Sequence, residues 1–237
     1  MRILALGLLL GWSLSGEVSV ASGDDVPRDK RVVVRVFGTP IHLNEITPDP
    51  APERKGDGRP EPRPPSLIAQ RAGLLLGKIQ ARVLTEYAVR AKLRPSDAEI
   101  DALIGDAVRK HSAGRTEEEQ RKLSLQAFWI MGASRDWRTA KALHEKYGGR
   151  VAVSSFGACE APDGRNALFR ESVASGELEF LDRELEIAFW EAAKSQRVLD
   201  VTLQPENVPR HFAVSPWERW IRELEHPPTA KEPAGGT

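Results

Sequence analysis

Residues 66–111 read SLIAQRAGLLLGKIQARVLTEYAVRAKLRPSDAEIDALIGDAVRKH, and this stretch decides the fold of the chain. In its first half, apolar residues recur with the spacing of one face of a 3.6-residue helix. These positions are Ala72, Leu75, Leu76, Ile79, Val83 and Tyr87. The spacing therefore predicts a long amphipathic helix over 67–93.

A second helix is predicted directly after Pro95. Ser96 and Glu99 form a capping box, in which the hydroxyl and the carboxylate each satisfy a free backbone amide of the new first turn. The helix over 97–111 then carries its own apolar stripe, made of Ile100, Leu103, Ile104, Ala107 and Val108. Neither helix can bury its stripe alone, so we expect the two to pack as a hairpin and to recruit further elements.

The joint between these helices carries a resemblance to a known family. Residues 93–101, LRPSDAEID, resemble the LTPSDEEID-like joint in the N-terminal region of the exported SurA/PrsA foldase-chaperones. Upstream, residues 32–41, VVVRVFGTPI, are similar to the VARVNGEPIT strand and turn that open that region. The resemblance covers about 31–111 and extends towards Tyr147. It implies a mainly α fold, SurA N-like or trigger-factor-C-like, with a small accessory β-sheet.

One insertion departs from the family. SurA-like chains lead almost directly from the strand into the helix, whereas residues 48–65 here are rich in proline, with Lys, Arg, Asp and Glu between the prolines. Proline removes amide donors and the charges resist burial, so we expect an extended surface linker. A proline-rich ligand for another protein is the alternative.

The first 21 residues have the order of a secretory signal. One basic residue precedes an apolar run from Ile3 to Leu10, and Ser19 and Ala21 occupy the −3 and −1 positions of a cleavage site. The run is shorter than the roughly 20 residues of a spanning helix, so we expect no stable membrane span. The mature chain would begin near Ser22 and lie in the periplasm or otherwise outside the cytoplasm. An uncleaved N-terminal anchor is the alternative.

The rest of the chain predicts a mixed α/β extension. A capping box at Thr116 opens a third helix through Leu143, with a bend or break at 132–134 and a stop at Gly148. Strands are expected over 150–156 and 199–204, and helices from Pro162, over 182–196 and from Ser215. The expected divisions are a signal peptide (1–21), an N-terminal segment with the first strand (22–47), the linker (48–65), a SurA N-like helical region (66–147), a C-terminal extension packing on the helices (148–226) and a disordered tail (227–237).

Composition and motifs offer little chemistry. Lys plus Arg number 34 and Asp plus Glu number 34, so no bulk charge indicates nucleic acid as a partner. Cys159 is the only cysteine, and we expect a small residue in a turn rather than a nucleophile, because Glu160 beside it disfavours a thiolate. No metal, phosphate or hydrolase motif occurs, and no histidine stands in the A-x-H-I-L-like context of a parvulin isomerase. The sequence therefore assigns no catalytic residue, metal or cofactor.

The third helix carries the candidate binding residues, which are Phe128, Trp129, Met131 and Trp137. This helix is apolar on more than one face, whereas a helix that serves one core needs a single stripe. The surplus face would contact either the C-terminal helix, which makes the cluster structural, or an unfolded or extended polypeptide. The family resemblance favours an exported, non-catalytic chaperone-like protein that binds peptides. The alternative is an isomerase-related or other enzyme with a site in the C-terminal half, indicated by His144 or His211 facing a carboxylate.

Overall fold

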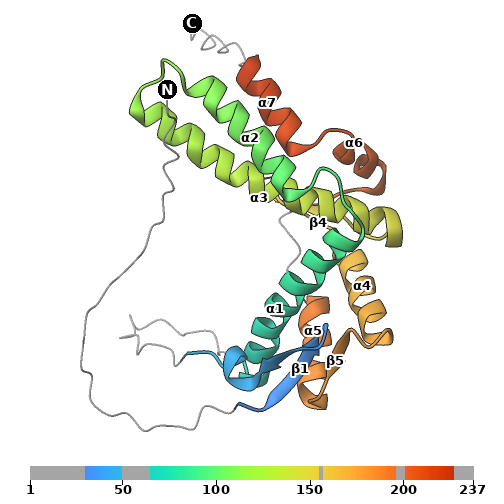
Figure 1. Cartoon of the computed structure of the whole chain (residues 1–237). Helices are drawn as coiled ribbons and strands as arrows, with labels where there is room; N and C mark the ends of the chain where they lie inside the picture. The colour runs from blue at the N-terminus through green and yellow to red at the C-terminus, as the bar shows by residue number, and fades with distance from the viewer. Residues whose placement is uncertain (1–29, 50–64, 155–156, 196–200, 227–237) are drawn as a thin grey trace, which may run out of the picture.

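The computed structural model describes residues 30–49, 65–154, 157–195 and 201–226 of the 237. The predicted signal peptide, most of the proline-rich linker and the predicted disordered tail lie outside the described residues. Within them the protein is mainly helical with a small accessory β structure, as the sequence predicts (Figure 1).

The described residues form seven α-helices and two small antiparallel sheets. The helices are α1 (Leu67–Arg90), α2 (Asp97–Ser112), α3 (Glu117–Tyr147), α4 (Pro162–Ala174), α5 (Arg183–Ser195), α6 (Val208–Phe212) and α7 (Pro216–Glu225). One sheet has the order β2-β1-β5, with β1 (Val32–Val36), β2 (Thr39–His42) and β5 (Leu178–Phe180). The other has the order β4-β3-β6, with β3 (Ala152–Val153), β4 (Cys159–Glu160) and β6 (Val201–Thr202). Two 3₁₀ turns, η1 (Leu43–Ile46) and η2 (Pro205–Asn207), complete the described elements.

The predicted hairpin of the first two helices is wrong. Helix α1 packs mainly against α5, whereas α2 packs against α3 and α7. In Figure 1, α2, α3 and α7 run alongside one another, and α1 leads away from them towards α5 and the β1 sheet. The stripe on α1 is buried as predicted, with Leu75 and Ile79 fully inaccessible. The spacing identified the buried face, but the partner of that face is set by the tertiary fold.

Helix α1 ends three residues earlier than predicted. Lys92 has a left-handed backbone, with a φ of 47°. The amide of Lys92 donates to the carbonyl of Val89, and the amide of Leu93 donates to that of Ala88, both at 3.1 Å. This is the hydrogen-bond pattern of a Schellman motif, which usually has glycine at the left-handed position. Because lysine occupies it here, the sequence carried no clear signal for this helix end.

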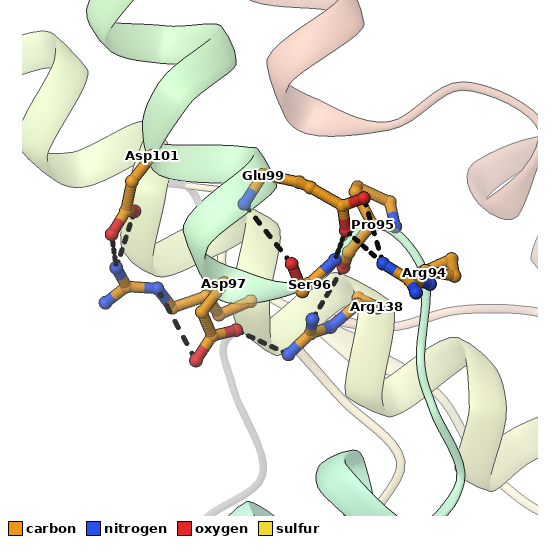
Figure 2. A network of polar contacts seen from close by, with 8 residues as sticks. Arg94, Pro95, Ser96, Asp97, Glu99, Asp101 and Arg138 are labelled. Carbon is orange, nitrogen blue, oxygen red and sulfur yellow. Dashed lines mark hydrogen bonds and ion pairs between the residues drawn. The ribbon is translucent and has the colours of Figure 1, made fainter.

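A polar network holds the start of α2 against α3 (Figure 2). The predicted capping box is present, since Ser96 Oγ accepts from the Glu99 amide and Glu99 accepts from the Ser96 amide. Arg138 of α3 donates to the carbonyl of Pro95 at 2.6 Å and to Asp97 at 2.5 Å. Only 7% of the Arg138 side chain is exposed. Its guanidinium thus satisfies a carbonyl at the end of the joint and a carboxylate in the first turn of α2.

Helix α3 is one uninterrupted helix, and the predicted bend at 132–134 is absent from it. Ala133 and Ser134 are buried in the packing, while Gly132 lies on the exposed side of the helix with open space around it. Gly148, with a φ of 69°, follows the last residue as the predicted stop, and the helix runs four residues past Leu143. Gly132 therefore does not break α3, because the residues next to it in the helix are held by packing.

The C-terminal elements complete structures that begin near the N-terminus. Strand β5, which the sequence analysis missed, pairs antiparallel with β1, with Val34 opposite Phe180. The predicted strand over 199–204 is described only from 201, and there β6 pairs with β3. The final helix begins as predicted, with Ser215 as its cap. The extension is thus part of the same hydrophobic core as the N-terminal helices.

Replacing Arg138 with methionine tests whether this side chain holds the joint between α1 and α2 against α3. Methionine retains an apolar stem but leaves Pro95 and Asp97 without their donor, so we expect a loss of about 1–3 kcal/mol in the free energy of unfolding. Arg135→Met is the matched control, because Arg135 is 41% exposed, bonds to Asp101 and reaches Asp97 only at 4.0 Å. The control should lose less than about 1 kcal/mol. Urea denaturation measures both, and equal losses would contradict the role given to Arg138.

Candidate functional site

The most exposed apolar surface on α3 is a stripe in its N-terminal half. Leu125, Phe128 and Trp129 are 59%, 64% and 58% exposed. Their spacing of three and four residues places them on one face of the helix. The rings of Phe128 and Trp129 meet edge to face with centroids 5.8 Å apart. We call these three residues the α3 stripe.

The opposite face of α3 is the one that packs on its neighbours. Leu123, Ala127, Ser134 and Arg138 are buried, and they lie about half a turn away from the α3 stripe. Arg138 bonds to Asp97 of α2, which identifies this face as the side that contacts α2. The α3 stripe therefore lies on the side of α3 opposite α2.

The structure divides the four predicted binding residues. Trp137 is buried, with its ring 5.8 Å from Phe212 and 5.5 Å from Trp217, and its Nε1 donates to the carbonyl of His211. Trp137 therefore has a structural role, as in the alternative that the sequence analysis left open, because it packs against the C-terminal helix α7. Met131 is partly buried against the core. Phe128 and Trp129 alone of the four are largely exposed, while Leu125, which the sequence analysis did not single out, extends their surface.

The face that carries the α3 stripe is covered further along the helix. Leu143 lies 18 residues, or about five turns, after Leu125, and so occupies the same face. There α4 approaches so closely that a Cβ on Gly164 would lie 3.0 Å from the carbonyl oxygen of Leu143. Strand β4 also packs against α3. This face is therefore packed at Leu143, whereas the N-terminal half of the helix extends past α1 (Figure 1).

A cleft lies between the open and the covered parts of this face. It has a volume of about 480 Å³ and is lined by α1, the start of α2, α3, β4 and α4. The α1 wall is formed largely by small or apolar residues, including Gly77, Ala81 and Ala88. The α3 wall includes Asp136 and Thr139, which continue the face of the α3 stripe by helical spacing. The exposed stripe thus leads along one helix face into the cleft.

The cleft holds one carboxylate without a direct partner. No hydrogen bond or ion pair to Asp136 occurs among the described residues, and the side chain is accessible to solvent. The surrounding walls nevertheless crowd it, and this desolvation together with the charge of Glu160 raises the pKa of Asp136 to about 6. The charge of Arg135 acts in the opposite direction.

Cys159 lies in strand β4, not in the predicted turn, and its side chain is buried in the hydrophobic core. Burial, together with the charges of Asp136 and Glu160, raises the pKa of the thiol to about 12. A thiol in this state is a poor nucleophile. Cys159 therefore acts as a small apolar residue at the edge of the cleft.

The two histidines considered for catalysis contact aromatic rings. His144 and His211 lie 5.8 and 5.4 Å from the ring of Phe212. Burial, with a smaller contribution from Arg219, lowers the pKa of His211. His144 Nδ1 and His211 Nε2 have no hydrogen-bond partner among the described residues. No group of three or more His, Cys, Asp or Glu in that part of the chain could hold a metal ion. The pair does not provide the histidine–carboxylate contact that would indicate an enzyme.

Sequence analysis missed two kinds of residue at this site. Asp136 and Glu160 come from different elements, and the residues between them carry no spacing motif that would link them. Leu125 could have been found, because it falls three and four residues before the two aromatic residues on a helix already predicted.

No described helix combines the length and apolar character needed to cross a membrane. Comparison of the chain with family models, with curated proteins and with solved structures finds no match.

Proposed function

We propose that this protein is an exported, chaperone-like protein that holds unfolded or extended polypeptide segments without catalysing a reaction. The observation that carries the proposal is the exposed α3 stripe beside the cleft. Two adjacent, largely exposed aromatic residues on a well-packed helix are typical of an interaction surface. The resemblance of residues 31–111 to SurA/PrsA chaperones supports the same function.

The size of the stripe suits weak, reversible binding. Covering the exposed parts of Phe128 and Trp129 would remove roughly 100–150 Å² of each from water. At about 25 cal/mol per Å², this burial contributes about 5–7 kcal/mol before the entropic costs of association. Those costs remove several kcal/mol, because both partners lose freedom and the polypeptide becomes ordered. From these two rings alone we expect a millimolar or weaker affinity, which further contacts would have to increase and which allows a bound segment to be released later.

Aggregation assays test the proposal. The protein, at a few-fold molar excess, should suppress aggregation of an unfolded model protein, measured by light scattering. Phe128→Ala with Trp129→Ala should remove most of the suppression, because these rings supply most of the exposed apolar area of the stripe.

Ile187→Ala on α5 is the matched control, since Ile187 is similarly exposed but lies on another helix. It should leave suppression unchanged, and thermal melts should show that all variants remain folded. Absence of suppression by the parent protein would refute the chaperone function. Equal loss in the control would show that the effect is not specific to α3.

Export is part of the same proposal, and its support is the order of charge, apolar run and small residues in the first 21 residues. Mass spectrometry of protein recovered from the extracytoplasmic fraction of the host should give a chain that begins near Ser22. Recovery only from the cytosol, or with Met1 intact, would contradict export.

A further inference from the structure

Three arginines line an open hollow between α6 and α7 (Figure 1). The hollow has a volume of about 500 Å³; Arg210 comes from α6, and Arg219 and Arg222 come from α7. The other titratable groups in its lining are Glu223 and His226. Three arginines against one glutamate leave an excess of two positive charges when His226 is neutral.

The three guanidinium groups have no hydrogen-bond or ion-pair partner among the described residues. Glu223 follows Arg219 by four residues, a spacing that often gives an ion pair on a helix, yet the two are not joined. Helix α5 shows the contrast, since its Arg183 pairs with Glu186 at 2.6 Å. The part of the chain that the structure describes therefore supplies no anion to these arginines.

The remaining carboxylates of α7 are engaged elsewhere. Glu218, four residues before Arg222, accepts a hydrogen bond from the Ser215 amide at 3.1 Å and so belongs to the helix cap. Glu225 accepts from Lys110 of α2 at 2.8 Å. Neither carboxylate lines the hollow. An anion that neutralises the arginines would have to come from outside the described residues.

Packing around Trp137 fixes α6 and α7 relative to each other. The ring of Trp137 lies 5.8 Å from that of Phe212 on α6 and 5.5 Å from that of Trp217 on α7. All three side chains are buried. The arrangement that brings Arg210 to the same hollow as the arginines of α7 is thus held by the core, so little reorganisation is needed to bind a ligand there.

We infer that this hollow binds a soluble phosphomonoester, whose phosphate is held by Arg210, Arg219 and Arg222. Near neutral pH such a phosphate carries about 1.5–2 negative charges and three strong acceptor oxygens, which matches the excess of two positive charges. Guanidinium groups donate paired hydrogen bonds to phosphate oxygens. A carboxylate carries one charge and would neutralise only half of the excess. The volume lies within the roughly 300–1,000 Å³ of small-molecule sites, which leaves room for the organic group.

The surroundings favour a soluble ligand over a lipid headgroup. Helices that bind a membrane surface insert large apolar side chains next to their basic residues. Neither α6 nor α7 contributes to the exposed large apolar residues. Trp217 and Trp220, the tryptophans of α7, are both buried. The phosphate is therefore expected on a small soluble molecule.

Isothermal titration calorimetry with glycerol 3-phosphate tests the inference. In phosphate-free buffer at pH 7.5 and low salt, the purified protein should bind glycerol 3-phosphate at least about tenfold more tightly than acetate, and should not bind glycerol. Arg219→Gln with Arg222→Gln should weaken the binding of glycerol 3-phosphate about tenfold or more, because two of the three cations are lost. In the parent protein, the ligand should shift the amide NMR signals of Ala213 and Val214, which line the hollow.

Arg115→Gln with Arg121→Gln is the matched control. Both arginines are exposed and lie outside the hollow, and their replacement changes the net charge by the same amount. This variant should bind glycerol 3-phosphate within about twofold of the parent. Thermal melts check that both double variants are folded, as expected for changes at exposed positions.

Cosedimentation with vesicles of phosphatidylcholine, with and without phosphatidic acid, separates the two sources of phosphate. The protein should remain in the supernatant with both. Binding to the phosphatidic acid vesicles without binding of glycerol 3-phosphate would overturn the soluble source.

Three other outcomes would refute the site. They are no binding of glycerol 3-phosphate by the parent, equal affinities for glycerol 3-phosphate and acetate, and equal losses in the two double variants. The hollow shares no residue with the α3 stripe, so these results are independent of the chaperone function proposed above.

Discussion

The length of α3 is the constraint on which the rest of the structure depends. At 31 residues it is about 46 Å long, more than the elements on one side of it can cover. One face is buried against α2 and α7, and α4 and β4 also pack against the helix, with α4 close to Leu143. In the other half of the helix, Leu125, Phe128 and Trp129 are largely exposed. The proposed interaction surface therefore lies on a helix that is longer than the elements packed against it.

The N-terminal half of α3 needs a rigid support, which the joint between α1 and α2 provides. Arg138 bonds to Pro95 and Asp97, so the middle of α3 is fixed to the first turn of α2. On the other side, Gly164 lets α4 approach the backbone of Leu143. A stripe held on a rigid element loses little conformational freedom when it binds, which preserves more of the apolar contribution to binding. Stability and the proposed function thus depend on the same helix.

Local signals predicted the helix starts, and tertiary contacts decided much of the rest. The cap at Ser96 could be predicted because its hydrogen bonds involve residues three apart, whereas the end of α1 could not, since Lys92 takes a position where glycine is usual. The predicted hairpin of α1 and α2 was wrong because an amphipathic stripe shows which face of a helix is buried but not which element packs against it. The sequence predicted that α3 carries more apolar residues than one buried face needs. Which of them are buried, as Trp137 is, and which are exposed depends on the position of α7. Asp136 and its cleft emerge only when α1, α3 and β4 come together.

Site-specific photo-crosslinking tests the central claim most directly, namely the proposal that the α3 stripe binds unfolded polypeptide. Benzoylphenylalanine would replace Phe128 in one variant and Ile187 in another, since both positions are exposed and apolar but lie on different helices. Each variant would be irradiated with the same unfolded protein and, separately, with its folded form. The account predicts crosslinks from position 128 to the unfolded form only, and few from position 187. Equal crosslinking from both positions, or crosslinking from position 187 alone, would contradict it.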